Sequence, residues 1–371
     1  MTVPTRDPGT PPLAQDHAAV DTLHRFLRIP SPSGEEGPMA AEAVAVMRGL
    51  GYRAEIDAAG NAVGVIGAGG GPRLMLLSHI DTVSGQIPVH LSDGRLHGRG
   101  AVDAKAAFAA MVHAGAALGP RFPGSVTVVG AVEEETPGSK GAVAVRETHR
   151  PPDALIVGEP SGWSTVVLGY KGKLDLRYRV TRPPTHPSNP EPKASELAAR
   201  CWHTLLDLLG PDSGHGAFGR PGATLIALHG DPVAAEAEFD VRTPPGFDTD
   251  ALLRALRERT PHGELTELHA VSAVRTTRRD PVVRALSAAV RAHGGELSQK
   301  VKTATSDMNT LAQAWDVPMA TYGPGDSRLD HADDEHIEID EYLKGVSVLA
   351  HALRRLATDE ELTRSHTCLS P

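Results

Sequence analysis

Continuous apolar runs recur through the first half of the chain. Residues 74–77, 125–132 and 154–157 are short and apolar, and the last two runs are also rich in β-branched side chains. Such runs are typical of strands that are buried on both faces of a sheet. We therefore expect three core strands in this half of the protein.

Helical periodicity separates and follows these runs. Val20, Leu23 and Leu27 lie on one stripe of a first helix that ends before Pro30. The Ala-rich segment 101–118 has a helical composition, and apolar residues recur with a 3.6-residue period from Ile339 to Leu353. The alternation of helices with buried strands predicts an α/β fold with a mixed central sheet flanked by helices.

The pattern changes from about residue 169 to 276. Leu174, Leu176, Tyr178 and Val180 alternate with charged residues, as in a sheet with one solvated face. A Pro-rich loop follows, and then further expected elements: a helix at 197–209, strands at 223–228 and 235–241, a helix near 252–256 and a strand near 264–274.

These patterns predict a smaller α+β domain inserted into the larger one. The expected domains are a discontinuous catalytic domain, 16–168 and 277–357, and an inserted dimerisation or lid domain, 169–276. Residues 1–15 and 358–371, rich in Pro, Thr, Ser and charge, are expected to be disordered tails.

Composition limits the class of protein. The 371 residues include 38 Gly and 30 Pro and carry a net charge of −9, which gives no basic footprint for nucleic acid. Apolar runs stay below the roughly 18 residues that span a membrane. Cys201 and Cys368 form no CxxC motif, and the first fifteen residues lack the apolar core of a signal peptide. We expect a cytoplasmic protein that binds neither membrane nor nucleic acid.

Acids and histidines follow the expected strands. In open α/β sheets, ligands bind beyond the carboxyl ends of the strands. A triple Glu alone indicates a solvated turn, but carboxylates that end buried strands need a cation to offset the cost of burial. The converging groups are His79 and Asp81, Asp103, Glu133-Glu134-Glu135, Glu159 and His331.

Five motifs in order carry a family resemblance over about residues 17–357. They are Ser78-His79-Ile80-Asp81-Thr82-Val83, Gly98-Arg99-Gly100-Ala101-Val102-Asp103, Glu134-Glu135, Gly158-Glu159-Pro160 and His331-Ala332-Asp333-Asp334-Glu335. The chain resembles the di-zinc amidohydrolases and peptidases that include acetylornithine deacetylase, succinyl-diaminopimelate desuccinylase, aminoacylase and the glutamate carboxypeptidases.

Within that family, three segments are most similar to hydrolases that release lysine or ornithine from an amino-group carrier protein. These segments are Gly100-Ala101-Val102-Asp103-Ala104-Lys105, Gly169-Tyr170-Lys171-Gly172 and Thr305-Ser306-Asp307-Met308-Asn309. Ala106 and Ala304 depart from the subgroup, which tends to carry Gly at both positions, but neither change touches the expected ligands.

The resemblance implies two metal ions. One is bound by His79 and Glu159, the other by Glu135 and His331, and Asp103 bridges both. Imidazole and carboxylate donors suit zinc or cobalt better than calcium or magnesium. Two such ions about 3.5–4 Å apart polarise a scissile carbonyl.

Two further acids have expected roles beside the ligands. Asp81 is suited to accept the other ring N–H of His79 and to fix its tautomer. Successive side chains of an extended segment point in opposite directions, so one member of the Glu134-Glu135 pair ligates while the other acts as general base. The resemblance assigns the base to Glu134. A register shifted by one, towards Glu133, stays open.

Three further candidates come by resemblance, two of them in the inserted domain. His186, in a Pro-rich loop, corresponds to a histidine that reaches the partner subunit's site and stabilises the oxyanion. Arg242 corresponds to an arginine that grips a substrate carboxylate with a planar, bidentate donor. Asn309, nearer the C-terminus, is a further substrate candidate. A surface loop histidine and a sheet-edge arginine remain the alternatives.

The resemblance thus implies a homodimeric amidohydrolase of lysine/arginine biosynthesis. It would cleave the amide between the terminal glutamate side chain of a carrier protein and the α-amino group of lysine or ornithine. The alternatives are a deacylase of N-acetyl or N-succinyl amino acids and a metal-free peptide-binding module. An acidic carrier would be repelled by a net charge of −9, so a basic face is expected. The candidates are Arg177, Arg179 and Arg182, together with Arg275, Arg278 and Arg279.

Overall fold

The computed structural model describes residues 14–360 and 362. Most of the expected tails, 1–15 and 358–371, therefore lie outside the described residues, although the first helix already begins at Ala14. The chain forms two compact units. The larger comprises the chain up to Leu168, Thr276–Lys300 and the part from Ser306 onward; the smaller comprises Gly169–Arg275 and Val301–Thr305.

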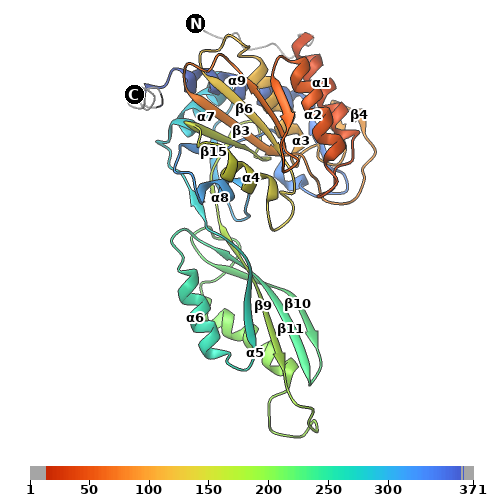
Figure 1. Cartoon of the computed structure of the whole chain (residues 1–371), viewed down its shortest axis with the longest axis vertical. Coiled ribbons are helices and arrows are strands. Elements are labelled where there is room, and N and C mark those ends of the chain that lie inside the picture. The colour runs from red at the N-terminus through yellow and green to blue at the C-terminus, as the bar shows by residue number, and fades with distance from the viewer. Residues whose placement is uncertain (1–13, 361, 363–371) are drawn as a thin grey trace. The chain divides into compact units, whose positions relative to one another are not determined.

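The larger unit contains a mixed sheet, as the sequence predicts (Figure 1). Strands β6, β3, β7 and β15 run parallel, and β1, β2 and β8 pair antiparallel at its sides. The strands, in their order across the sheet, are β1 (Arg53–Ile56), β2 (Ala62–Ile66), β6 (Ser125–Ala131), β3 (Arg73–His79), β7 (Ala154–Gly158), β15 (Met319–Thr321) and β8 (Thr165–Tyr170).

Helices cover both faces of this sheet. The chain moves from β3 to its neighbour β6 and then back past β3 to β7, so right-handed crossovers place α3 and α4 on opposite faces. The helices of this unit are α1 (Ala14–Leu27), α2 (Gly37–Gly49), α3 (Lys105–Ala116), α4 (Lys140–Thr148), α7 (Pro281–Ala292), α8 (Asp307–Ala312) and α9 (Ile339–Ala357). A small sheet of β4 (His90–Ser92), β5 (Arg95–His97) and β16 (His336–Glu338) completes it.

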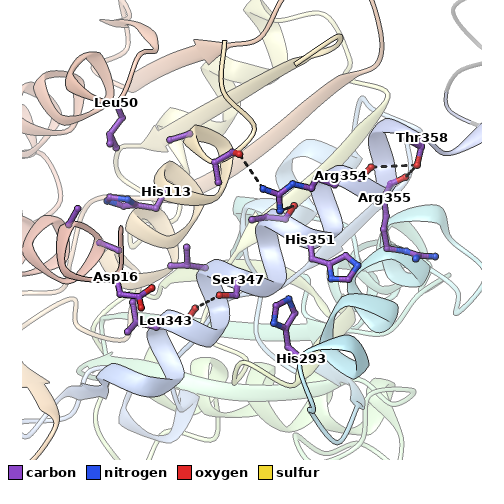
Figure 2. Close-up of a pocket in the computed structure, with 16 residues that line it drawn as sticks. Asp16, Leu50, His113, His293, Leu343, Ser347, His351, Arg354, Arg355 and Thr358 are labelled. Carbon is purple, nitrogen blue, oxygen red and sulfur yellow. Dashed lines mark hydrogen bonds between the residues drawn. The ribbon is translucent and has the colours of Figure 1, made fainter. Parts of the chain in front are cut away.

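Burial follows the patterns read from the sequence. Every residue of β3 after Arg73 is buried, as the continuous apolar run predicts. Helix α9 buries Tyr342, Leu349 and Leu353 along one stripe. Its half-buried Leu343 faces a pocket that His113 of α3 and His351 also line (Figure 2). The predicted helix 101–118 was wrong at its start, because α3 begins only at Lys105.

The smaller unit is an antiparallel sheet covered by two helices. Strand β9 (Gly172–Thr181) alternates buried and accessible residues, as predicted. The buried face of the sheet packs against α5 (Ala194–Leu209) and α6 (Thr249–Arg259), and Cys201 lies in this core. The sheet order is β10 (Gly222–Gly230), β11 (Ala234–Thr243), β9 and β12 (Glu264–Val271).

Two further short strands pair with β8 of the large sheet. β13 (Val274–Arg275) pairs with the last residues of β8, and β14 (Ser298–Lys302) also pairs with β8. Residues 301–305, which the sequence analysis assigns to the larger domain, belong to the smaller unit. Among the described residues, no helix is both long and apolar enough to cross a membrane.

Candidate active site

Three parallel strands deliver polar residues to one edge of the large sheet. Ser78 of β3 is level with Gly130 of β6 on one side and with Gly158 of β7 on the other. The residues that follow these strands therefore emerge together. They are His79, the segment Glu133-Glu134-Glu135, and Glu159. This is the convergence expected from the sequence, and it follows from strand register alone.

One donor group surrounds Asp103. His79, Asp103 and Glu135 each offer a donor atom, and these atoms lie within 4.8 Å of one another. Oδ1 of Asp103 is 3.2 Å from Nε2 of His79, while its Oδ2 is 3.1 Å from Nε2 of His331. His331 is also 3.0 Å from Oε1 of Glu135. The two oxygens of Asp103 thus face two histidines, which is the arrangement that a bridging carboxylate needs.

A second donor group also contains His79. Donor atoms of His79, Glu134 and Glu159 also fall within 4.8 Å of one another. Glu134 and Glu159 are both buried or nearly so, whereas His331 is half exposed. Glu134 therefore sits among the donors themselves, within reach of any small molecule bound to them.

Asp81 has a role that the sequence analysis missed. Nδ1 of His79 lies 3.0 Å from the backbone carbonyl of Asp81 and 3.4 Å from its carboxylate, so the closer partner is the main chain. The carboxylate instead accepts the backbone N–H groups of Glu134 (3.1 Å) and Glu135 (3.0 Å), and the hydroxyl of Ser33 (2.7 Å). Asp81 therefore fixes the course of the Glu134-Glu135 segment.

A glycine-containing turn brings Asp103 to the cluster. Gly100 has a φ of +85°, and a Cβ there would lie 2.9 Å from the Lys105 side chain and 3.1 Å from that of Thr82. Only glycine fits this conformation and this space. Asp103 lies two residues before α3 rather than in a helix, so its carboxylate is free of helical geometry and faces both histidines.

The ionisable groups reflect an excess of negative charge. Burial alone lowers the pKa of His79, but hydrogen bonds to Asp103 and Asp81 outweigh it and raise this pKa well above its usual value. A hydrogen bond to Asp103 is the main cause that raises the pKa of His331 to about 9. Burial, together with the charge of Glu159, raises the pKa of Glu134 well above its usual value. The cluster therefore attracts protons, and by the same electrostatics it attracts cations.

Asp307 is a further buried acid near this cluster. It begins α8 and is 1% exposed, and burial raises its pKa to about 7. The charges of His79 and Asp81 act on it. Asp307 belongs to the Thr305-Ser306-Asp307-Met308-Asn309 motif, and its position after the helix-capping Ser306 is the only signal in the sequence that points to it.

His186 lies in the smaller unit, in the loop between β9 and α5. It is exposed, and its Nδ1 accepts a hydrogen bond from the backbone N–H of Ser188 at 3.2 Å. In the neutral ring the proton is then on Nε2, which points to a donor role for that atom.

The two expected substrate residues have partners of their own. Arg242 on β11 donates from Nε to Asp240 (2.9 Å) and from Nη1 to the hydroxyl of Thr305 (3.2 Å). Asn309 is buried in the larger unit, where its Oδ1 accepts the backbone N–H of Ser306 at 3.0 Å. Its side chain thus serves the cap of α8, while Arg242 remains partly accessible, with 24% of its side chain exposed.

The arginines of β9 are paired rather than free. Arg177 contacts Glu238 at 2.6 Å and Glu236 at 3.3 Å on the neighbouring strand, and Arg179 also pairs with Glu236. Arg182 contacts Glu191 at 2.7 Å. The expectation that these three arginines supply a basic face is therefore wrong, because glutamates neutralise them. Glu236 and Glu238 do so across the strands, and Glu191 does so in the loop that follows β9.

The profile of Peptidase family M20/M25/M40 matches residues 75–355. The chain belongs to this family. The match begins within β3 and ends within α9, so it spans both donor groups of the larger unit and the whole of the smaller unit.

Relatives within the M20/M25/M40 family match over almost their entire length. A LysW-lysine hydrolase of Deinococcus radiodurans is 40% identical over 360 residues, covering 93% of this chain and 99% of the relative. A protein of Pyrococcus furiosus, named as a putative LysW-lysine/LysW-ornithine hydrolase, is 34% identical and covers 92% of this chain and 98% of the relative.

Solved structures of the family share the fold. A tripeptidase of Staphylococcus aureus superposes with a TM-score of 0.77 at 19% identity, covering 93% of this chain and 99% of the other. The Bacillus subtilis protein YXEP, described as a dinuclear metal-binding peptidase, gives 0.71 at 13% identity, covering 93% and 99%. These likenesses establish the M20 architecture.

Proposed function

We propose that this chain is a two-metal amidohydrolase that releases lysine and/or ornithine from an amino-group carrier protein. The observation that carries the chemistry is the meeting of His79, Asp103, Glu134, Glu135 and Glu159 at one edge of the sheet. The substrate is inferred from relatives named for LysW-lysine and LysW-ornithine, which match more than nine-tenths of this chain.

The donors fit two divalent cations. His79 and Glu159 would hold one ion, Glu135 and His331 the other, and Asp103 would bridge them. Two imidazoles with several carboxylates in so small a volume match zinc or cobalt. Two bound metal ions would polarise the scissile carbonyl and lower the pKa of a bound water molecule.

Glu134 acts as the general base. Its carboxylate lies among the donors and accepts the proton of the attacking water, and it then delivers that proton to the leaving α-amino group. Its backbone is held by Asp81, so the carboxylate keeps one position through both transfers.

The smaller unit contributes the remaining contacts. Nε2–H of His186 stabilises the oxyanion of the tetrahedral intermediate, in the site of the partner subunit. The guanidinium of Arg242 binds the free α-carboxylate of the lysine. Asn309, whose Oδ1 accepts the backbone N–H of Ser306 in the α8 cap, is proposed as a further substrate residue.

A homodimer is consistent with the surface of the smaller unit. Strand β10 is at the edge of its sheet, and Ile226 and Leu228 on this strand are 58% and 43% exposed. An edge strand with exposed apolar side chains is suited to pair with a second copy of itself. We place the enzyme in the cytoplasm, in lysine and arginine biosynthesis.

The main rival is a deacylase of N-acetyl or N-succinyl amino acids, since the metal centre acts only on the amide. A turnover comparison separates the two. Purified enzyme, loaded with zinc or cobalt, is offered carrier-linked lysine, carrier-linked ornithine, N-acetyl-lysine, N-acetylornithine and N-succinyl-diaminopimelate. We expect kcat/KM for the carrier-linked amides to exceed the others at least about 10²-fold.

The Glu134→Gln variant is the control for contaminating hydrolases. Preference for a small acyl substrate would replace the carrier assignment by the deacylase. A protein that binds neither zinc nor cobalt would instead revive a metal-free binding module.

A further inference from the structure

Glu335 is a fully buried carboxylate four residues after His331. Its Oε1 accepts the backbone N–H of Val102 at 2.8 Å and that of Asp103 at 3.0 Å. Its Oε2 accepts Nη1 of Arg99 at 2.8 Å. All three bonds involve an ionised acceptor, which makes them stronger than bonds between neutral groups.

Arg99 connects Glu335 to the backbone next to His331. The same Nη1 that contacts Glu335 also donates to the backbone carbonyl of Ala332, the residue after His331, at 3.1 Å. Its Nε donates to the carbonyl of Gly85 at 3.0 Å. The guanidinium is largely buried, with 12% of the side chain exposed. Arg99 therefore holds the chain beside His331 and, through Glu335, the chain at Asp103.

The backbone around these residues is secured independently of the two side chains. The carbonyl of Glu335 accepts the N–H of Gly98 at 3.1 Å, and His336 pairs with His97 between β16 and β5. A change confined to the Glu335 or Arg99 side chain therefore leaves these loops joined. What it removes is the fixed orientation of the Asp103 backbone relative to His331.

We propose that Glu335 and Arg99 are positioning residues of the metal centre, setting the distance between Asp103 and His331 so that both can ligate the same ion. The inference rests on the proposed function. It also explains why a carboxylate is needed: two oxygens accept from opposite sides, whereas the amide of glutamine offers one acceptor and turns an NH2 towards either Arg99 or the backbone.

The test measures metal binding by the full-length protein after a chelator has removed all bound metal. Glu335→Gln, Arg99→Lys and the control Asp333→Asn are titrated with Co²⁺, followed by its visible absorption, and with Zn²⁺ in competition with a chromophoric chelator. Asp333 is exposed and lies in the same loop, so it matches the charge change of Glu335→Gln. We expect Glu335→Gln and Arg99→Lys to weaken the affinity for the second equivalent about 10–100-fold, and the control to match wild type.

Stability of the chelated proteins separates positioning from folding. We expect the metal-free melting temperature of Arg99→Lys to stay close to that of Asp333→Asn, and the Co²⁺ spectrum at saturation to differ from wild type. The effect of the double variant on affinity should be smaller than the sum of the single effects, because both residues act through one contact.

Unchanged metal affinity in both variants, with wild type binding two equivalents, would overturn the positioning role and leave the proposed function intact. So would a lowered metal-free stability as the sole effect. Wild-type protein that binds no Co²⁺ or Zn²⁺ would instead overturn the proposed metal centre itself.

Discussion

The backbone N–H of Glu135 donates a 3.0 Å hydrogen bond to Oδ2 of Asp81. This bond joins the end of β6 to the end of β3, in addition to the ladder between the strands themselves. Because the neighbouring N–H of Glu134 donates to Oδ1, one side chain sets the direction of both glutamates. The chemistry of the site therefore depends on a residue that need not touch the substrate.

The first prediction concerns this residue. In Asp81→Asn, one oxygen is replaced by an NH2 group that cannot accept a backbone N–H, so the Glu134-Glu135 segment loses one of its anchors. We expect kcat/KM to fall about 10–100-fold, with a parallel loss of metal affinity measured by chelator competition. Ser33→Ala, which removes only the 2.7 Å hydroxyl contact, should have a smaller effect. Wild-type kinetics and metal binding in Asp81→Asn would contradict the anchoring role.

The second prediction separates the two glutamates. Glu134→Gln should lower kcat by at least about 10²-fold, the usual loss for a positioned general base, while metal content stays near two equivalents. Glu135→Gln should lose one equivalent, because Glu135 contacts His331 and lies within the donor group of Asp103. Metal content by elemental analysis and single-turnover rates check both. The reverse pattern would mean that the two roles are exchanged.

The third prediction tests whether His186 acts across a dimer. Glu134→Gln and His186→Ala proteins, each nearly inactive, are mixed and allowed to exchange subunits. In a mixed dimer the His186→Ala subunit keeps Glu134 and receives His186 from its partner, so one of the two sites is complete. Random assortment makes about half of the dimers mixed, and about a quarter of wild-type activity should return.

Subunit exchange is followed independently by mass spectrometry of a mass-tagged pair. If exchange is complete and no activity returns, His186 serves its own subunit or neither, and the assignment in trans fails.

The fourth prediction concerns stability in acid. His113 in α3 contacts the hydroxyl of Thr22 at 2.9 Å and lines the pocket in Figure 2. Burial lowers the pKa of His113 to about 4. In the unfolded chain the histidine pKa is about 6.5, so between about pH 6.5 and 4 the unfolded state binds a proton that the folded state does not bind. The free energy of unfolding therefore decreases as the pH drops through this interval. At pH 5 the loss is about 2 kcal/mol.

His113→Gln removes this titration while retaining a side chain that can donate to Thr22. Urea unfolding of the chelated proteins at pH 7 and pH 5 measures the loss, and wild type should lose more stability than His113→Gln over this interval. Chelation keeps metal release out of the comparison. Equal losses in the two proteins would show that His113 can be protonated without unfolding.

The sequence predicted the elements whose signal is local. The apolar run at 74–77, the alternation in β9 and the period of α9 each report directly which side chains are buried, and each is confirmed. Short strands such as β4, β5 and β16 were not predicted, because three residues are too few to show a periodicity. The start of α3 was misplaced for a related reason, since alanine composition cannot show that Gly98 to Asp103 forms a turn.

The features of the site also separate into those that local sequence could predict and those that it could not. Donors at strand ends could be anticipated, because parallel strands that carry them must meet at one edge. The contacts of Asp81 and Glu335 could not, since both depend on which backbone N–H groups lie within reach in space. The pairing of Arg177 with Glu238 likewise follows from the register of β9 and β11, which no pattern along one strand reveals.

The insertion of the smaller unit also governs how this protein is made. His79, Asp103, Glu135 and Glu159 all precede it, whereas His331 follows it, roughly 170 residues later. At a synthesis rate of about 5–20 residues per second, a nascent chain carries the first four donors for on the order of ten to thirty seconds before the fifth leaves the ribosome. Under the proposed function, metal capture at the Glu135 and His331 position would therefore be a late event, coupled to completion of nearly the whole polypeptide.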